Sequence, residues 1–156
     1  MWYYWALVKH FLTANSRHGT HSPFVYRLAE EVIYAKKPNV DPAVVFPSYF
    51  PWRYRSLLAA VLSSIELREL QAFEVGKEAN AVWVDLHQVS TEGLLSLLEK
   101  GTVIIVHEPH KATRLWNSIA ADHRVVVSVD LFHFGMLMHR EGQRKEHFVL
   151  RYPYWR

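Results

Sequence analysis

The apolar run Val103-Ile104-Ile105-Val106 is the feature that most restricts the fold of this chain. Successive side chains of a strand point to opposite faces of its sheet, so an uninterrupted apolar run needs apolar cover on both faces. Such runs are typical of parallel sheets that have helices on either side. The chain is therefore expected to be an α/β protein.

The segments around this run alternate between strand and helix signals. Strands are expected at residues 70–75, 81–86, 102–106, 124–131, 135–140 and 147–152. Helices are expected at 91–100, which Ser90 caps and Gly101 ends, and at 111–122. The last three strands are joined by short links, so we expect them to be antiparallel. The sheet would then be mostly parallel, with antiparallel terminal strands.

The first 50 residues predict a helical arm and a connector. Helices are expected at 3–13 and 24–34, and Ser22 and Pro23 supply an N-cap and a first-position proline to the second of them. Residues 36–51 contain four prolines and cannot hold a regular element for long.

An amphipathic helix is expected at 52–64, directly after the connector. We therefore divide the chain into an arm with its connector, residues 1–50, and an α/β domain, residues 51–156. A chain of 156 residues is long enough to bury a substantial core.

Composition restricts partners and compartment. The net charge is +3, but the basic residues are scattered apart from Arg140, Arg144 and Lys145, which we expect in a solvated turn between strands. A nucleic-acid partner is therefore not expected. The chain has no cysteine, which excludes disulfides and thiolate metal sites and favours a cytoplasmic location.

The amino-terminal sequence MWYYWALVKHFL is rich in aromatic residues. It is too short to span a bilayer, and it lacks the basic leading region and the cleavage site of a signal peptide. Trp2, Trp5 and Leu12 would share one face of a helix. We expect this helix to dock on protein, and peripheral contact with a membrane is the alternative.

Three segments resemble class I S-adenosylmethionine-dependent methyltransferase-like proteins of bacteria. Residues 17–34, RHGTHSPFVYRLAEEVIY, resemble the arm that precedes the catalytic domain in that family. Residues 81–88, AVWVDLHQ, look like its fourth strand. Residues 104–152, from IIVHEPHK to HFVLRY, resemble its closing section of a fifth strand, a helix and a terminal strand pair. The resemblance implies a Rossmann-like sheet that binds S-adenosylmethionine.

The segment FEVGKEAN, residues 73–80, departs from that family. In the family the first strand ends in an acidic residue and a glycine-rich turn that admits the methionine moiety of the cofactor. Glu74 and Gly76 match the start of this motif, but the following glycines are absent. The next strand begins at Ala81, which leaves no room for the second and third strands that hold the ribose and adenine. We expect a shortened sheet, a vestigial cofactor site and a first strand that has become an edge.

Polar residues follow two of the expected parallel strands. The carboxyl ends of such strands meet at one edge of the sheet, where ligands bind in open α/β folds. By the resemblance to metal-assisted members of the family, the metal-ligand candidates are Asp85, His107, Glu108 and His110. Asp85, His87 and His107 are the candidates for catalysis. The favoured alternative is structural, with hydrogen bonds from the histidines to loops, because no diagnostic ligand spacing is present. The same alternative is favoured for His18 and His21 in the arm.

These observations lead to a first hypothesis with two alternatives. The first hypothesis is a non-catalytic, methyltransferase-like interaction protein that binds a protein partner or a second copy through the first-strand edge or the aromatic helix. The second is a methyltransferase whose S-adenosylmethionine site is completed by a partner or a second chain, as Glu74, Gly76 and Asp85 would allow. The third is a small protein or enzyme that binds a divalent metal. Enzymatic activity is thus left open.

Overall fold

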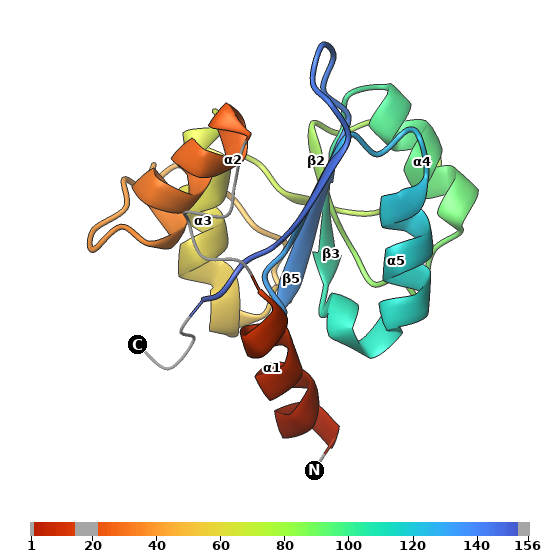
Figure 1. Ribbon diagram of the computed structural model, residues 1–156. Coiled ribbons are helices and arrows are strands. Elements are labelled where there is room, and N and C mark those ends of the chain that lie inside the picture. Colours follow the sequence, from red (N-terminus) through yellow and green to blue (C-terminus); the bar gives the residue numbers. More distant parts are fainter. Residues whose placement is uncertain (1, 15–21, 153–156) are drawn as a thin grey trace.

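The computed structural model describes residues 2–14 and 22–152. Within them, five α-helices and a six-stranded mixed, mostly parallel sheet form an α/β fold, which confirms the expected class (Figure 1). The helices are α1 (Trp2–Thr13), α2 (Pro23–Leu28), α3 (Arg55–Ser64), α4 (Thr91–Glu99) and α5 (Thr113–Ala121). The strands are β1 (Gln71–Ala72), β2 (Ala81–Val84), β3 (Val103–His107), β4 (Val127–Asp130), β5 (Phe134–Met138) and β6 (Glu146–Val149).

Three short helical turns adjoin these helices. The π-helical turn η2 (Ala29–Ile33) continues α2, and the 3-10 turns η3 (Trp52–Tyr54) and η4 (Pro109–Ala112) precede α3 and α5. Ser22 caps α2 as expected, because its hydroxyl accepts a hydrogen bond from the backbone of Val25 at 3.5 Å. None of the helices in the described ranges is long and apolar enough to cross a membrane.

The sheet has the strand order β1-β2-β3-β5-β4-β6. Only β5, among the described strands, runs against its neighbours β3 and β4. The expectation that the last three strands are antiparallel is wrong for β6, which pairs in parallel with β4. After β5 the chain turns back past the start of β4. Strand β6 then pairs with the side of β4 that faces away from β5, for example through the hydrogen bond from Glu146 N to Val126 O at 2.8 Å.

Helices cover both faces of the sheet, as the apolar run in β3 requires. Figure 1 shows α2 and α3 on one face and α4 and α5 on the other. Ile105 belongs to the core on the α3 side, whereas Ile104 and Val106 belong to the core on the side of α4 and α5. Alternate side chains of one strand therefore enter two separate apolar layers.

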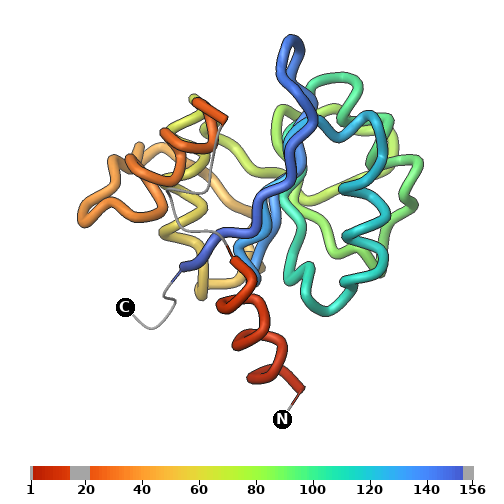
Figure 2. The backbone as a smooth tube through the Cα atoms, viewed as in Figure 1, coloured from red at the N-terminus to blue at the C-terminus, as the bar shows by residue number. Residues whose placement is uncertain are grey.

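The arm residues that the structure describes pack in part on the sheet. Val25, Leu28 and Val32, from α2 and η2, lie in the same apolar core as α3 and the sheet. Helix α1 instead projects from the body of the molecule (Figure 2), on the side where β3 ends (Figure 1). The division at residue 50 stays a prediction.

Strand β1 lies at one edge of the sheet and is shorter than the expected 70–75. Val45 of the connector pairs with Glu69 just before it, through bonds from Val45 N to Arg68 O at 2.8 Å and from Leu70 N to Val45 O at 3.0 Å. The connector thus covers the entry to β1, and no described strand lies outside β1 itself.

Candidate functional site at the carboxyl ends of the strands

Asp85 and His107 leave the sheet at the same edge, because Val84 of β2 pairs in parallel with Val106 of β3. The carboxylate of Asp85 turns back on its own loop, where it accepts a hydrogen bond from the backbone of His87 at 2.9 Å. The His87 side chain is exposed on that loop. Asp85 therefore closes a turn, and His87 lies at the surface.

His107 is held in one tautomer by Tyr54 and Trp83. The Trp83 indole donates to the Tyr54 hydroxyl at 3.0 Å, and this hydroxyl lies 2.7 Å from His107 Nδ1. Since the hydroxyl already accepts from Trp83, its own proton is available to Nδ1, which leaves the ring proton of His107 on Nε2. Burial lowers the pKa of His107 and raises that of Tyr54 above its ordinary value. Both groups are therefore neutral at pH 7.

Glu108 connects His107 to a second histidine. Its carboxylate lies 3.2 Å from His107 Nε2, pairs with Lys111, and approaches His133 Nδ1 at 3.8 Å. Burial opposes ionisation of Glu108, but the hydrogen bond from Lys111 and the nearby His107 outweigh it and lower its pKa. Glu108 is thus a largely buried, ionised carboxylate with its partners within the protein.

His110 attaches the start of the α5 segment to the loop between β4 and β5. Its Nδ1 donates to the backbone oxygen of Phe132 at 2.8 Å, and its ring stacks on Phe132 with centroids 4.0 Å apart. Its buried Nε2 has no hydrogen-bond partner in the described residues. This is the structural role expected for a strand-end histidine.

Tyr3 of α1 contacts the strand-end cluster, which consists of His107, Glu108, His110 and His133. The Tyr3 hydroxyl lies 3.2 Å from His133 Nε2 and accepts from Arg53 at 3.2 Å. A second link joins His10 Nε2 to the Asp130 carboxylate at 3.2 Å. These contacts could not be predicted from the sequence, because Tyr3 and His133 are 130 residues apart. The one available signal was His133 itself, a histidine in an apolar stretch that follows a strand.

The four metal candidates do not form a ligand set. No group of three or more histidine or acidic side chains is placed to hold a metal ion in the described parts of the chain. Asp85 faces its own loop, and His110 uses Nδ1 on a backbone oxygen. The catalytic roles of Asp85, His87 and His107 stay predictions.

The cofactor candidates Glu74 and Gly76 lie on an exposed turn between β1 and β2. Glu74 pairs with Lys77 at 3.0 Å, with both side chains 61% exposed. Gly76 has a positive φ of 81°, and nothing lies within 4 Å of the position that a Cβ would occupy. Among the described residues, none therefore packs against Gly76 on the side that a Cβ would occupy.

Other candidates lie elsewhere. His18 and His21 fall outside the described residues. Lys145 donates to the backbone oxygens of Ala120 and Val125, each at 2.8 Å, near the end of α5. Arg140 lies over the Phe24 ring, 4.1 Å from its centroid. These two basic residues therefore make intramolecular contacts.

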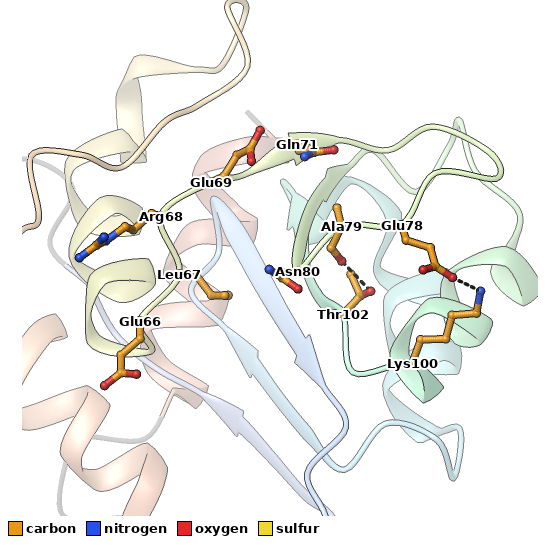
Figure 3. A pocket seen from close by; sticks show the side chains of 10 residues that line it. All are labelled: Glu66, Leu67, Arg68, Glu69, Gln71, Glu78, Ala79, Asn80, Lys100 and Thr102. Atoms are coloured by element: carbon orange, nitrogen blue, oxygen red, sulfur yellow. Dashed lines mark hydrogen bonds and ion pairs between the residues drawn. The ribbon is translucent and has the colours of Figure 1, made fainter.

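A polar hollow of about 530 Å³ lies at the opposite end of the sheet, before β1, β2 and β3 (Figure 3). Its charges are mixed. Lys100 pairs with Glu78 at 2.8 Å, and Arg68 pairs with Asp41 at 2.9 Å. The lining residues are Glu66, Leu67, Arg68, Glu69, Gln71, Glu78, Ala79, Asn80, Lys100 and Thr102, none of which the sequence analysis selected.

In the strand-end cluster the ionised Glu108 lies between the neutral side chains of His107 and His133, and Tyr3 of α1 contacts His133. In comparisons with known proteins, no family model, curated protein sequence or solved structure matches the chain.

Proposed function

We propose that this chain is a shortened relative of class I S-adenosylmethionine-dependent methyltransferases that has lost cofactor binding and acts as a non-catalytic protein-interaction module. The observation that carries the proposal is the direct link between β1 and β2. Only residues 73–80 join the two strands. Glu74 and Gly76 lie within this link.

The geometry of this link supports loss of the cofactor. Phe73 N still bonds to Trp83 O at 3.0 Å, and Lys77 N bonds to Glu74 O at 3.2 Å, so the chain turns at once toward β2. Val75, between the two motif residues, is 92% exposed. A nucleoside needs contacts on several sides to be held, and this turn supplies none for the ribose or the adenine.

The β1 edge is the surface that we assign to a protein partner. An edge strand presents backbone donors and acceptors that another chain can pair. Val45 and Val75, on either side of β1 in the sequence, are exposed, and so are Tyr49 of the connector and Trp52 of η3. A partner protein or a second copy that added a strand or a helix here would cover apolar side chains and satisfy the edge.

The retained Glu74, Gly76 and Asp85 favour the alternative of a methyltransferase whose site is completed by another chain. Titration calorimetry of the purified chain with S-adenosylmethionine tests the loss of cofactor binding. We expect no heat of binding, because one polypeptide supplies only one side of the site. Micromolar binding by the isolated chain would overturn the proposal.

The partner surface is tested separately. Sedimentation velocity tests whether a second copy binds the β1 edge. If it does, the wild type should be a dimer that Val45→Glu/Val75→Glu dissociates, and the control Tyr26→Glu on α2 should stay dimeric. If the wild type is monomeric, a photoreactive residue at position 75 should form a defined protein adduct in cells, whereas one at position 26 should not. A monomer with no adduct specific to position 75 contradicts this surface.

A further inference from the structure

Helix α1 has apolar residues on both of its sides. Tyr3, Leu7 and His10 are half-buried against the body of the protein. On the other side Trp2, Trp5 and Leu12 are 61%, 70% and 73% exposed, and Tyr4 and Val8 are exposed as well. A surface helix in water normally carries polar residues on its outer side. The outer face of α1 therefore has the composition of a buried surface.

The inner contacts hold this outer face in place. Tyr3 is bonded near one end of the helix through Arg53 and His133, and His10 is bonded near the other end through Asp130. The helix cannot turn its outer face inward without breaking both links. It also projects from the molecule, so that a surface can approach its outer side (Figures 1 and 2).

The shape of the outer face suits a broad surface rather than a small ligand. Trp2, Tyr4, Trp5 and Val8 line a shallow, open hollow of about 540 Å³. Small molecules bind in concave sites that bury most of their area. A projecting helix with an open apolar side fits a broad, deformable surface such as a lipid bilayer better than it fits a small molecule.

The charges around α1 favour an anionic surface. No acidic residue occurs between residues 2 and 14, and Lys9 is exposed on the helix. Arg53, which bonds to Tyr3, is exposed next to it. The nearby carboxylates of Asp130 and Glu108 are largely buried and are paired with His10 and with Lys111. The exposed charged side chain on α1 and the exposed one that bonds to it are therefore both positive.

We propose that the outer face of α1 binds the surface of an anionic lipid bilayer, with the helix lying parallel to the membrane plane. At 12 residues the helix is about 18 Å long, too short to cross the hydrocarbon core. Trp and Tyr side chains favour the headgroup region, and Leu12 and Val8 add apolar area that can enter the acyl boundary. This inference goes beyond the proposed function and does not depend on it.

Co-sedimentation of the full chain with phosphatidylcholine vesicles, with and without phosphatidylserine, tests the proposal. We expect the wild type to bind the vesicles that contain phosphatidylserine and to bind the neutral vesicles more weakly. Trp5→Ser/Leu12→Ser should lower the partition coefficient about a hundredfold, because two large apolar side chains no longer leave water. Lys9→Glu should reduce binding to the anionic vesicles alone.

The matched control is Tyr26→Ser/Val40→Ser, which removes two exposed apolar side chains away from α1 and from the β1 edge. It should bind as the wild type does, and circular dichroism checks that both double variants fold. Lipids brominated along their acyl chains should quench tryptophan fluorescence in the wild type but less in the α1 variant. Absence of wild-type binding, or equal losses in both double variants, would overturn the proposal. So would a dimer in solution that the α1 double variant dissociates, since a second copy would then cover the face.

Discussion

At the scale of single residues, Glu108 connects His107 and His133 in the strand-end cluster. It adopts a left-handed backbone conformation with φ 42°, which is uncommon for a residue with a side chain. Its backbone N–H donates to the oxygen of His133 at 2.9 Å, while its carboxylate faces His107 and Lys111. The local conformation is therefore supported by a long-range backbone bond to His133 and by side-chain contacts with neighbours in the sequence.

His133 predicts a dependence of stability on pH. It faces Tyr3, Arg53, Glu108 and His110, and burial, together with the charges of Arg53 and His110, lowers its pKa from 6.5 to about 4. The unfolded chain takes up this proton near pH 6.5, whereas the folded protein does not until about pH 4. The free energy of unfolding should thus decrease by up to about 3 kcal/mol as the pH falls through this window.

Urea unfolding at several pH values measures this effect. His133→Gln should show a weaker dependence than the wild type, because one of the groups that bind protons only on unfolding is absent. It should keep part of the dependence, since burial also lowers the pKa of His107, His110 and His147. Identical pH profiles for the two proteins would contradict the assignment.

At the scale of elements, β5 and α5 meet without space between them. Gly135, the second residue of β5, lies under the buried Trp116 ring, and a Cβ at this position would be 2.5 Å from the nearest ring atom. Neither the backbone of a central strand nor a ring in a packed core can move freely. The close approach therefore requires glycine.

Gly135→Ala should lower the free energy of unfolding by about 1–3 kcal/mol through overpacking. The measurement is urea unfolding of the single variant and of the same change in a Trp116→Leu background. In that background the additional cost of Gly135→Ala should shrink, because the ring that blocks the Cβ is gone. An equal cost in both backgrounds would show that the ring is not the cause.

Most elements could be predicted from local patterns, and the misses have physical reasons. The caps at Ser22 and Ser90 and the apolar periodicities place α2 and α4, because these signals depend on neighbouring residues alone. The position of β6 could not be predicted in this way. Strand patterns do not specify a neighbour, and β6 pairs with β4 rather than with β5, the strand before it in sequence.

At the scale of the whole molecule, the described part of the arm and the sheet share one core. Val25 and Leu28 of α2 pack in the same cluster as Ile105 of β3. Elements that share one apolar core are expected to unfold together in a single cooperative transition. The arm from residue 22 onward should therefore unfold with the sheet.

Leu28→Ala tests this cooperativity. Leu28 is 3% exposed, so its truncation should cost about 2–5 kcal/mol. Far-ultraviolet circular dichroism and tryptophan fluorescence should still report one coincident transition, shifted by the same amount. Val40→Ala, at a position 41% exposed, should leave it nearly unchanged. Two separate transitions in Leu28→Ala would contradict a shared core.

The α/β class, the order of most helices and strands, and the short link between Gly76 and Ala81 could be predicted from the sequence, because periodicity, caps and chain length are local properties. The sequence also placed Asp85 and His107 at the same edge, since parallel strands align their carboxyl ends. The contact of Tyr3 with His133 and the position of Glu108 between two histidines could be seen only in the folded chain. Hydrogen bonds between residues 130 positions apart depend on how the helices pack on the sheet, which no local pattern encodes.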